Sequence, residues 1–223
     1  MAKIVVAAVI FIISALLWNT FVLYPVKMFV VVLHELSHGL AAVLMGGGIE
    51  RIQIDARIGG YCVYYLPAAA GFFRQAFVAS AGYLGSMLWG CLIFMAAARS
   101  RRDREITLSI GITVLALSFF VIKSGELFGI LFCFAFSAML LAAYKWFPDL
   151  FHDLFLKFLG LTGCLYVLID IKEDLIDRSG IGSDADALAR LMGIPQLSIV
   201  IGIAWVVLAL LVLWFSLKAS LKS

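Results

Sequence analysis

Two histidines and a glutamate lie within five consecutive residues, His34-Glu35-Leu36-Ser37-His38. On a helix, side chains four residues apart share one face, so both imidazoles can reach the same metal ion. Glu35 then lies beside that ion without having to coordinate it. In zinc hydrolases, a glutamate in this place takes a proton from water and passes it to the leaving amine. The motif therefore predicts a bound Zn²⁺, with His34 and His38 as metal ligands and Glu35 as the catalytic acid and base.

The residues around the motif make it a stronger signal than the same pattern in a soluble helix. Residues 29–33 and 39–43 on either side carry no charge and are mostly apolar. An ionisable side chain at the centre of a bilayer costs about 2.5–3.5 kcal/mol on insertion scales. Three such side chains within five residues need a compensating function, and metal binding provides one.

A third protein ligand is expected, because catalytic zinc normally has three of them and a water molecule. Acidic residues at the end of an apolar run are the best candidates. Asp170 follows directly from the apolar residues 165–169, and it is the preferred ligand. Asp174, four residues later, is the second choice, and Asp184 or another residue is the third.

The remaining histidine and the four cysteines are not expected to bind the metal. His152 lies between Asp149 and Asp153 in a short link that we interpret as solvated. The cysteines form no paired metal motif, and we interpret them as buried structural thiols. They are Cys62, Cys91, Cys133 and Cys164.

The composition indicates a membrane protein. The chain has 223 residues, of which 64% are hydrophobic and 14% charged, whereas a soluble domain is about 45–50% apolar and 25% charged. A helix needs about 20 apolar residues to cross a bilayer. We predict an all-α polytopic membrane protein with about seven (six to seven) transmembrane helices in a single domain, residues 1–223. The predicted spans are 4–24, 28–46, 72–98, 106–123, 126–147, 153–171 and 196–217.

Two segments between the spans differ from them in composition. Three glycines at 46–48 end the motif helix, and residues 49–66 then alternate and are rich in strand formers, which predicts a β-hairpin. Its edge could accept an extended peptide as an added strand, or it could be a plain extramembrane hairpin. Residues 172–195 are polar, and the pair Ser183 and Asp186 predicts a capped surface helix over about 184–192.

These features together resemble the site-2 protease family of intramembrane zinc metallopeptidases, and more narrowly its compact M50B-like branch. The resemblance rests on the His34–His38 motif, the hairpin after it, the small residues 79–86 and the acidic region 170–186. It implies a helical core that holds zinc inside the membrane and cleaves the transmembrane segment of a partner protein. His34 and His38 match the metal ligands of the family, and Glu35 matches its catalytic residue. The Leu-Asp-Gly motif of better-known members is absent, and Asp170 is the closest positional equivalent.

The charges bear on orientation and on partners. Residues 99–104 contain four arginines, and basic residues beside spans tend to remain in the cytoplasm. We therefore expect residues 99–105, 146–152 and the C-terminal tail to face the cytoplasm, in a bacterial cytoplasmic membrane. Resemblance to bacterial family members favours the opposite side, with the hairpin in the cytoplasm. Nucleic acid is not an expected partner; the lipid bilayer and a membrane protein substrate are.

Two other classes of function compete with proteolysis. An inactive relative would bind membrane helices and use its metal for folding or sensing, but it would not need Glu35. A transporter would scatter its buried charges over several spans, whereas here they concentrate at 34–38 and 170–174. The sequence therefore favours an intramembrane zinc endopeptidase.

Overall fold

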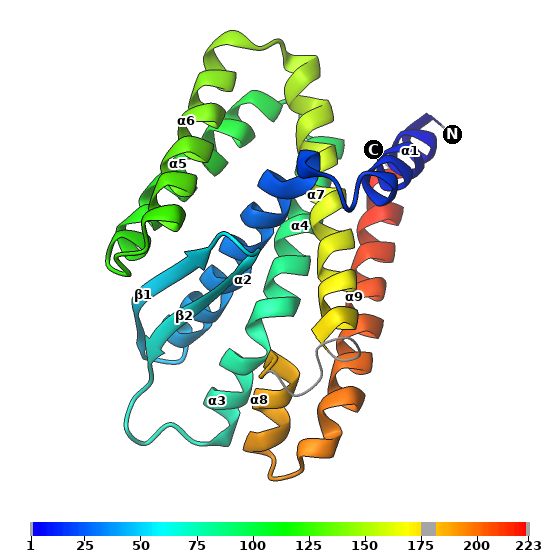
Figure 1. Cartoon of the computed structure of the whole chain (residues 1–223). Helices are drawn as coiled ribbons and strands as arrows, with labels where there is room; N and C mark the ends of the chain where they lie inside the picture. The colour runs from blue at the N-terminus through cyan, green and yellow to red at the C-terminus, as the bar shows by residue number, and fades with distance from the viewer. Residues whose placement is uncertain (1, 175–181, 222–223) are drawn as a thin grey trace.

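The computed structural model describes residues 2–174 and 182–221, and helices dominate it (Figure 1). One two-stranded antiparallel sheet follows the motif helix. The helices are α1 (Ala2–Leu16), α2 (Tyr24–Leu44), α3 (Phe72–Ala79), α4 (Ala81–Arg99), α5 (Asp103–Ile122), α6 (Leu127–Trp146), α7 (Asp149–Lys172), α8 (Asp184–Leu191) and α9 (Ser198–Leu221). Short 3-10 turns, η1 (Phe21–Leu23) and η3 (Pro195–Leu197), precede α2 and α9.

Six helical segments of the described chain are long and apolar enough to cross a membrane: Phe21–Leu44, Ala81–Arg99, Asp103–Ile122, Leu127–Trp146, Asp149–Lys172 and Pro195–Ser220. The first predicted span, 4–24, is shorter than expected, because α1 ends at Leu16 and the chain turns before η1. At 1.5 Å per residue, the 15 residues of α1 extend about 22 Å, less than the roughly 30 Å of a hydrocarbon core. The chain is therefore an integral membrane protein with six full-length candidate spans.

The predicted span 72–98 is divided into two helices. The break falls at Ser80, whose hydroxyl donates a hydrogen bond to the carbonyl of Ala76. The break turns α3 away from the direction of α4, so that α3 lies beside α8 (Figure 1). The small residues that follow Ser80 begin α4 directly against α2.

Helix α2 lies in the most enclosed span: 78% of its apolar 18-residue stretch is buried, against 28% of the corresponding stretch in the span that contains α9. The helices α4 and α7 pack closely together beside it. A Cβ atom added to Gly160 in α7 would lie 2.7 Å from the Gly90 carbonyl oxygen of α4, so only glycine permits this approach. The motif on α2 is consequently held inside the helix bundle.

The predicted hairpin is confirmed as β1 (Gly48–Asp55) and β2 (Gly59–Tyr65), which lie alongside α2. Pairing runs from Gly48 opposite Tyr65 to Asp55 opposite Gly59, with an irregularity between Ile49 and Arg51. Ile52 and Ile54 are buried in the main core. A Cβ atom on Gly129 of α6 would lie 2.9 Å from the Ile54 carbonyl oxygen, so α6 approaches β1 closely.

The predicted surface helix is also present, as α8. The Ser183 hydroxyl accepts a hydrogen bond from the Asp186 amide, and the Asp186 carboxylate accepts one from the Ser183 amide. Ser198 at the start of α9 donates a further hydrogen bond to Asp186, at 2.5 Å. These contacts fix where α8 begins, and the remaining residues of the predicted polar stretch, 175–181, lie outside the described part.

Candidate metal centre

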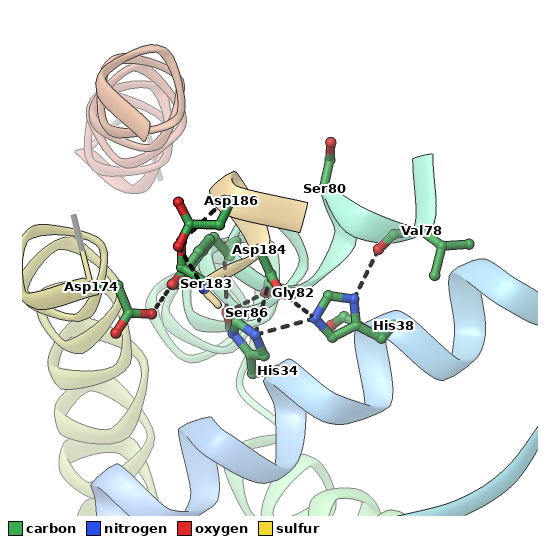
Figure 2. A network of polar contacts seen from close by, with 12 residues as sticks. His34, His38, Val78, Ser80, Gly82, Ser86, Asp174, Ser183, Asp184 and Asp186 are labelled. Atoms are coloured by element: carbon green, nitrogen blue, oxygen red, sulfur yellow. Dashed lines mark hydrogen bonds and ion pairs between the residues drawn. The ribbon is translucent and has the colours of Figure 1, made fainter. Parts of the chain in front are cut away.

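Three side chains from two helices converge on one another (Figure 2). His34 and His38 come from α2, and Asp184 is the first residue of α8. The two Nε2 atoms are 3.2 Å apart, and they lie 3.3 Å and 3.2 Å from the Asp184 carboxylate oxygens. In a tetrahedral zinc site with bonds of about 2.1 Å, ligand atoms are about 3.4 Å apart. The three groups therefore have the spacing of metal ligands.

His38 is oriented by the break between α3 and α4. Its Nδ1–H donates a hydrogen bond of 2.8 Å to the carbonyl oxygen of Val78, the penultimate residue of α3 (Figure 2). In a neutral imidazole this places the lone pair on Nε2, directed at His34 and Asp184. The ring of Tyr83 packs edge-on against His34, with centroids 5.0 Å apart. Each imidazole thus has a supporting contact on α3 or α4.

Asp184 completes the group as an anion. Burial acts to raise the pKa of its carboxyl, but His38 and His34 outweigh that effect and hold the pKa well below its ordinary value. Its Oδ2 atom is buried, and it has no hydrogen-bond partner among the described residues, although His34 Nε2 is 3.3 Å away. A buried carboxylate oxygen without a hydrogen-bond donor is well suited to a cation.

Gly82 provides the space for that cation. A Cβ atom added to Gly82 would lie less than 3.0 Å from the Nε2 atoms of His34 and His38 and from Oδ2 of Asp184. The backbone of α4 therefore leaves an atom-sized space where the three ligand atoms meet. Two imidazoles, one carboxylate and this space together fit a zinc ion.

Glu35 lies beside this group without belonging to it. It is 6% exposed, and the backbone of Cys62 in β2 contributes a hydrogen bond to it. A Cβ atom on Gly60 would lie 3.2 Å from its Cγ, so the hairpin closes directly over the side chain. Burial, and then the charge of Glu35, raise the pKa of the Cys62 thiol to about 12, which keeps that thiol protonated at neutral pH.

A cavity of about 350 Å³ opens over the three groups and Glu35. Its walls come from α2, α3, α4, α7, α8 and β2 and from the chain just before β2 and just before α8. Besides the four site residues, it is lined by Val31, Ile58, Gly59, Gly60, Tyr61, Cys62, Tyr64, Ala79, Tyr83, Tyr166, Asp170, Asp174, Gly182, Ser183 and Ala187. The site therefore has room for a polypeptide segment.

The structure places Asp184, rather than the preferred Asp170, against the two histidines. Asp170, on α7, and Asp174, two residues beyond the end of that helix, both line the same cavity, and Asp174 accepts a hydrogen bond from the Tyr83 hydroxyl. Among the described residues, the group whose ligand atoms lie within 4.8 Å of one another contains only His34, His38 and Asp184. Asp184 reaches the site because the chain comes back to the two histidines after α7. No local sequence pattern predicts this contact.

The interpretation of His152 as a solvated loop residue is wrong. Helix α7 already begins at Asp149, so His152 lies in its first turn and is fully buried. Its Nδ1–H donates a hydrogen bond of 3.0 Å to the Thr107 hydroxyl oxygen, because the Thr107 proton is used toward the Asp103 carbonyl.

A family model described as Peptidase M50B-like matches residues 6–216. No curated protein and no solved structure matches the chain. The matched range includes the three converging side chains, Glu35 and the hairpin.

Proposed function

Because the chain belongs to the Peptidase M50B-like family, we propose that it is a zinc-dependent endopeptidase that cleaves transmembrane segments of other membrane proteins. The observation that carries the proposal is the convergence of His34, His38 and Asp184 on the space beside Gly82, next to the buried Glu35. The six candidate spans support an integral membrane setting for this chemistry. The specific membrane that we propose is the bacterial cytoplasmic membrane.

His34, His38 and Asp184 would hold the zinc ion. When bound, zinc would act as a Lewis acid that polarises the scissile carbonyl and favours loss of a proton from water. The Val78 carbonyl keeps His38 in the tautomer that this role requires. Asp184 contributes the negative charge that two neutral imidazoles lack.

Glu35 would move the proton. Its carboxylate would accept a proton from the attacking water and deliver it to the nitrogen of the leaving amine. The hydrogen bond from the Cys62 backbone and the close approach of Gly60 hold the carboxylate at the cavity wall. Since Glu35 is not among the three converging groups, this role leaves metal binding to the other side chains.

The hairpin would hold the substrate. A transmembrane helix has all its backbone groups bonded internally, so a segment must become extended before one peptide bond can be attacked. Within the described part of the chain, β2 pairs only with β1, and its residues Gly60, Cys62 and Tyr64 line the cavity. An extended segment that pairs with the other edge of β2 would pass over the metal group.

A comparison of wild-type protein with Glu35→Gln tests the proposal. We expect single-pass membrane proteins to accumulate uncut in cells that carry only Glu35→Gln, as measured by membrane proteomics. Glu50→Gln is the matched control, because Glu50 is exposed on the hairpin and pairs with Arg51 outside the cavity. Unchanged fragment patterns in Glu35→Gln cells would contradict the proposal.

A further inference from the structure

A second groove, of about 800 Å³, adjoins the cavity of the metal centre. Four residues line both spaces, namely Tyr64, Ala79, Gly182 and Ala187. The groove continues between the segment after β2, α3 and α8, where its walls are Leu66, Pro67, Ala68, Ala70, Gln75, Arg190 and Leu191. A polypeptide that occupies the cavity therefore has a continuous path along this groove.

Arg190 is the one charged side chain among the described residues that line this groove. Its Nε–H donates a hydrogen bond of 3.3 Å to the backbone carbonyl of Asp186, and no described carboxylate forms an ion pair with it. The Asp186 carboxylate, one turn away, is occupied by hydrogen bonds from Ser183 and Ser198. The guanidinium is thus anchored by its Nε and can present its terminal nitrogens to a ligand.

A guanidinium binds a carboxylate through two parallel hydrogen bonds, and the other walls of the groove are largely apolar. The ligand chemistry that fits is an acidic side chain within an otherwise uncharged extended segment. Its position can be derived from the helix. Arg190 lies six residues after Asp184, about 9 Å along α8 at 1.5 Å per residue. An extended peptide covers that distance in about three residues, at roughly 3.3 Å each.

We propose that Arg190 is a specificity-determining residue that selects substrates with Asp or Glu about three residues from the scissile bond. The inference rests on the proposed function, because it assigns the substrate class of the same site. Arg190 takes no part in the chemistry: it lies outside the metal group and does not line the cavity that contains it.

The first test maps cuts in an unfolded probe. Full-length protein in detergent is given dephosphorylated β-casein, and the cut positions are identified by mass spectrometry. We expect Asp and Glu to be enriched about three residues from the cuts made by wild-type protein. Arg190→Glu should shift the enrichment to Lys and Arg, while Arg190→Lys should keep a weaker acidic preference. Arg74→Glu is the matched control, since Arg74 lies on α3 but does not line the groove.

The second test measures binding without turnover. In a Glu35→Gln background, a labelled extended peptide with a single Glu should bind about threefold more tightly than the same peptide with Lys, the size expected for an exposed ion pair. Arg190→Glu should reverse that order. Equal binding of the two peptides, or a cut pattern that Arg190→Glu leaves unchanged, would overturn the role of Arg190. Cleavage that persists in Glu35→Gln would instead overturn the proposed function, and zinc content confirms that each variant is folded.

Discussion

Gly82 of α4 lies directly against His34 of α2: a Cβ atom on Gly82 would come within 3.0 Å of the His34 Nε2 atom. The same added atom would crowd His38 and Asp184 equally, so the three ligand atoms surround one point (Figure 2). The residue type at position 82 is therefore tied to the proposed metal site, although glycine itself would coordinate nothing.

Gly82→Ala should abolish zinc binding because the methyl group fills the space meant for the ion. Elemental analysis of purified wild-type protein should give about one zinc per chain, and the variant should fall close to zero. Gly163→Ala is the control, since a Cβ atom there would meet Val30 at an ordinary 3.4 Å. Full zinc occupancy in Gly82→Ala would show that the ion binds elsewhere.

The third ligand can be identified by amide substitutions. Asp184→Asn should weaken zinc binding strongly, because an amide is a poor replacement for a carboxylate on this metal. Asp170→Asn and Asp174→Asn should have much smaller effects, since one residue lies near the end of α7, the other just beyond it, and both are outside the converging group. Competition with a chelator of known affinity measures the zinc affinity of all three variants. If Asp170→Asn loses more zinc affinity than Asp184→Asn, then Asp170 is the third ligand.

The cap of α8 should influence the metal through Asp184. Ser183→Ala removes the side-chain acceptor of the capping box, which costs about 1 kcal/mol of helix stability. Because Asp184 is the first residue of that helix, we expect zinc affinity to fall by up to about fivefold, with the fold of the spans retained. Ser124→Ala, at the end of α5, should leave zinc affinity unchanged. Identical affinities in both variants would mean that α8 is positioned independently of its cap.

Membrane orientation is testable by labelling single cysteines in a background that lacks the four native ones. The Arg104 guanidinium donates a hydrogen bond to the Phe147 carbonyl. The links around residues 99–104 and 146–149 therefore lie at the same end of the bundle. We expect that end to be cytoplasmic and therefore Ser100→Cys to resist an impermeant reagent in intact cells. Ser179→Cys, in the segment outside the described residues, should react. If the reagent labels position 100, the orientation is opposite to the one expected, and the hairpin lies in the cytoplasm.

Local patterns in the sequence were sufficient to predict the motif helix, the hairpin and α8. His34 and His38 share a helical face by spacing alone, and Ser183 with Asp186 announces a helix start. The position of Asp184 depends instead on how the chain returns to α2 after α7, which is a tertiary property. The burial of His152 was missed for a related reason, since it depends on α7 beginning four residues earlier than predicted.

The most direct test of the account is the position and metal dependence of the cut in a single-pass membrane substrate. Purified protein is reconstituted in vesicles with a substrate found to accumulate in Glu35→Gln cells, and the products are mapped by mass spectrometry. The account predicts a cut inside the apolar segment that disappears after chelation, returns with added zinc, and is absent in Glu35→Gln even though that variant retains its zinc. A cut outside the apolar segment, or one that survives chelation, would contradict it.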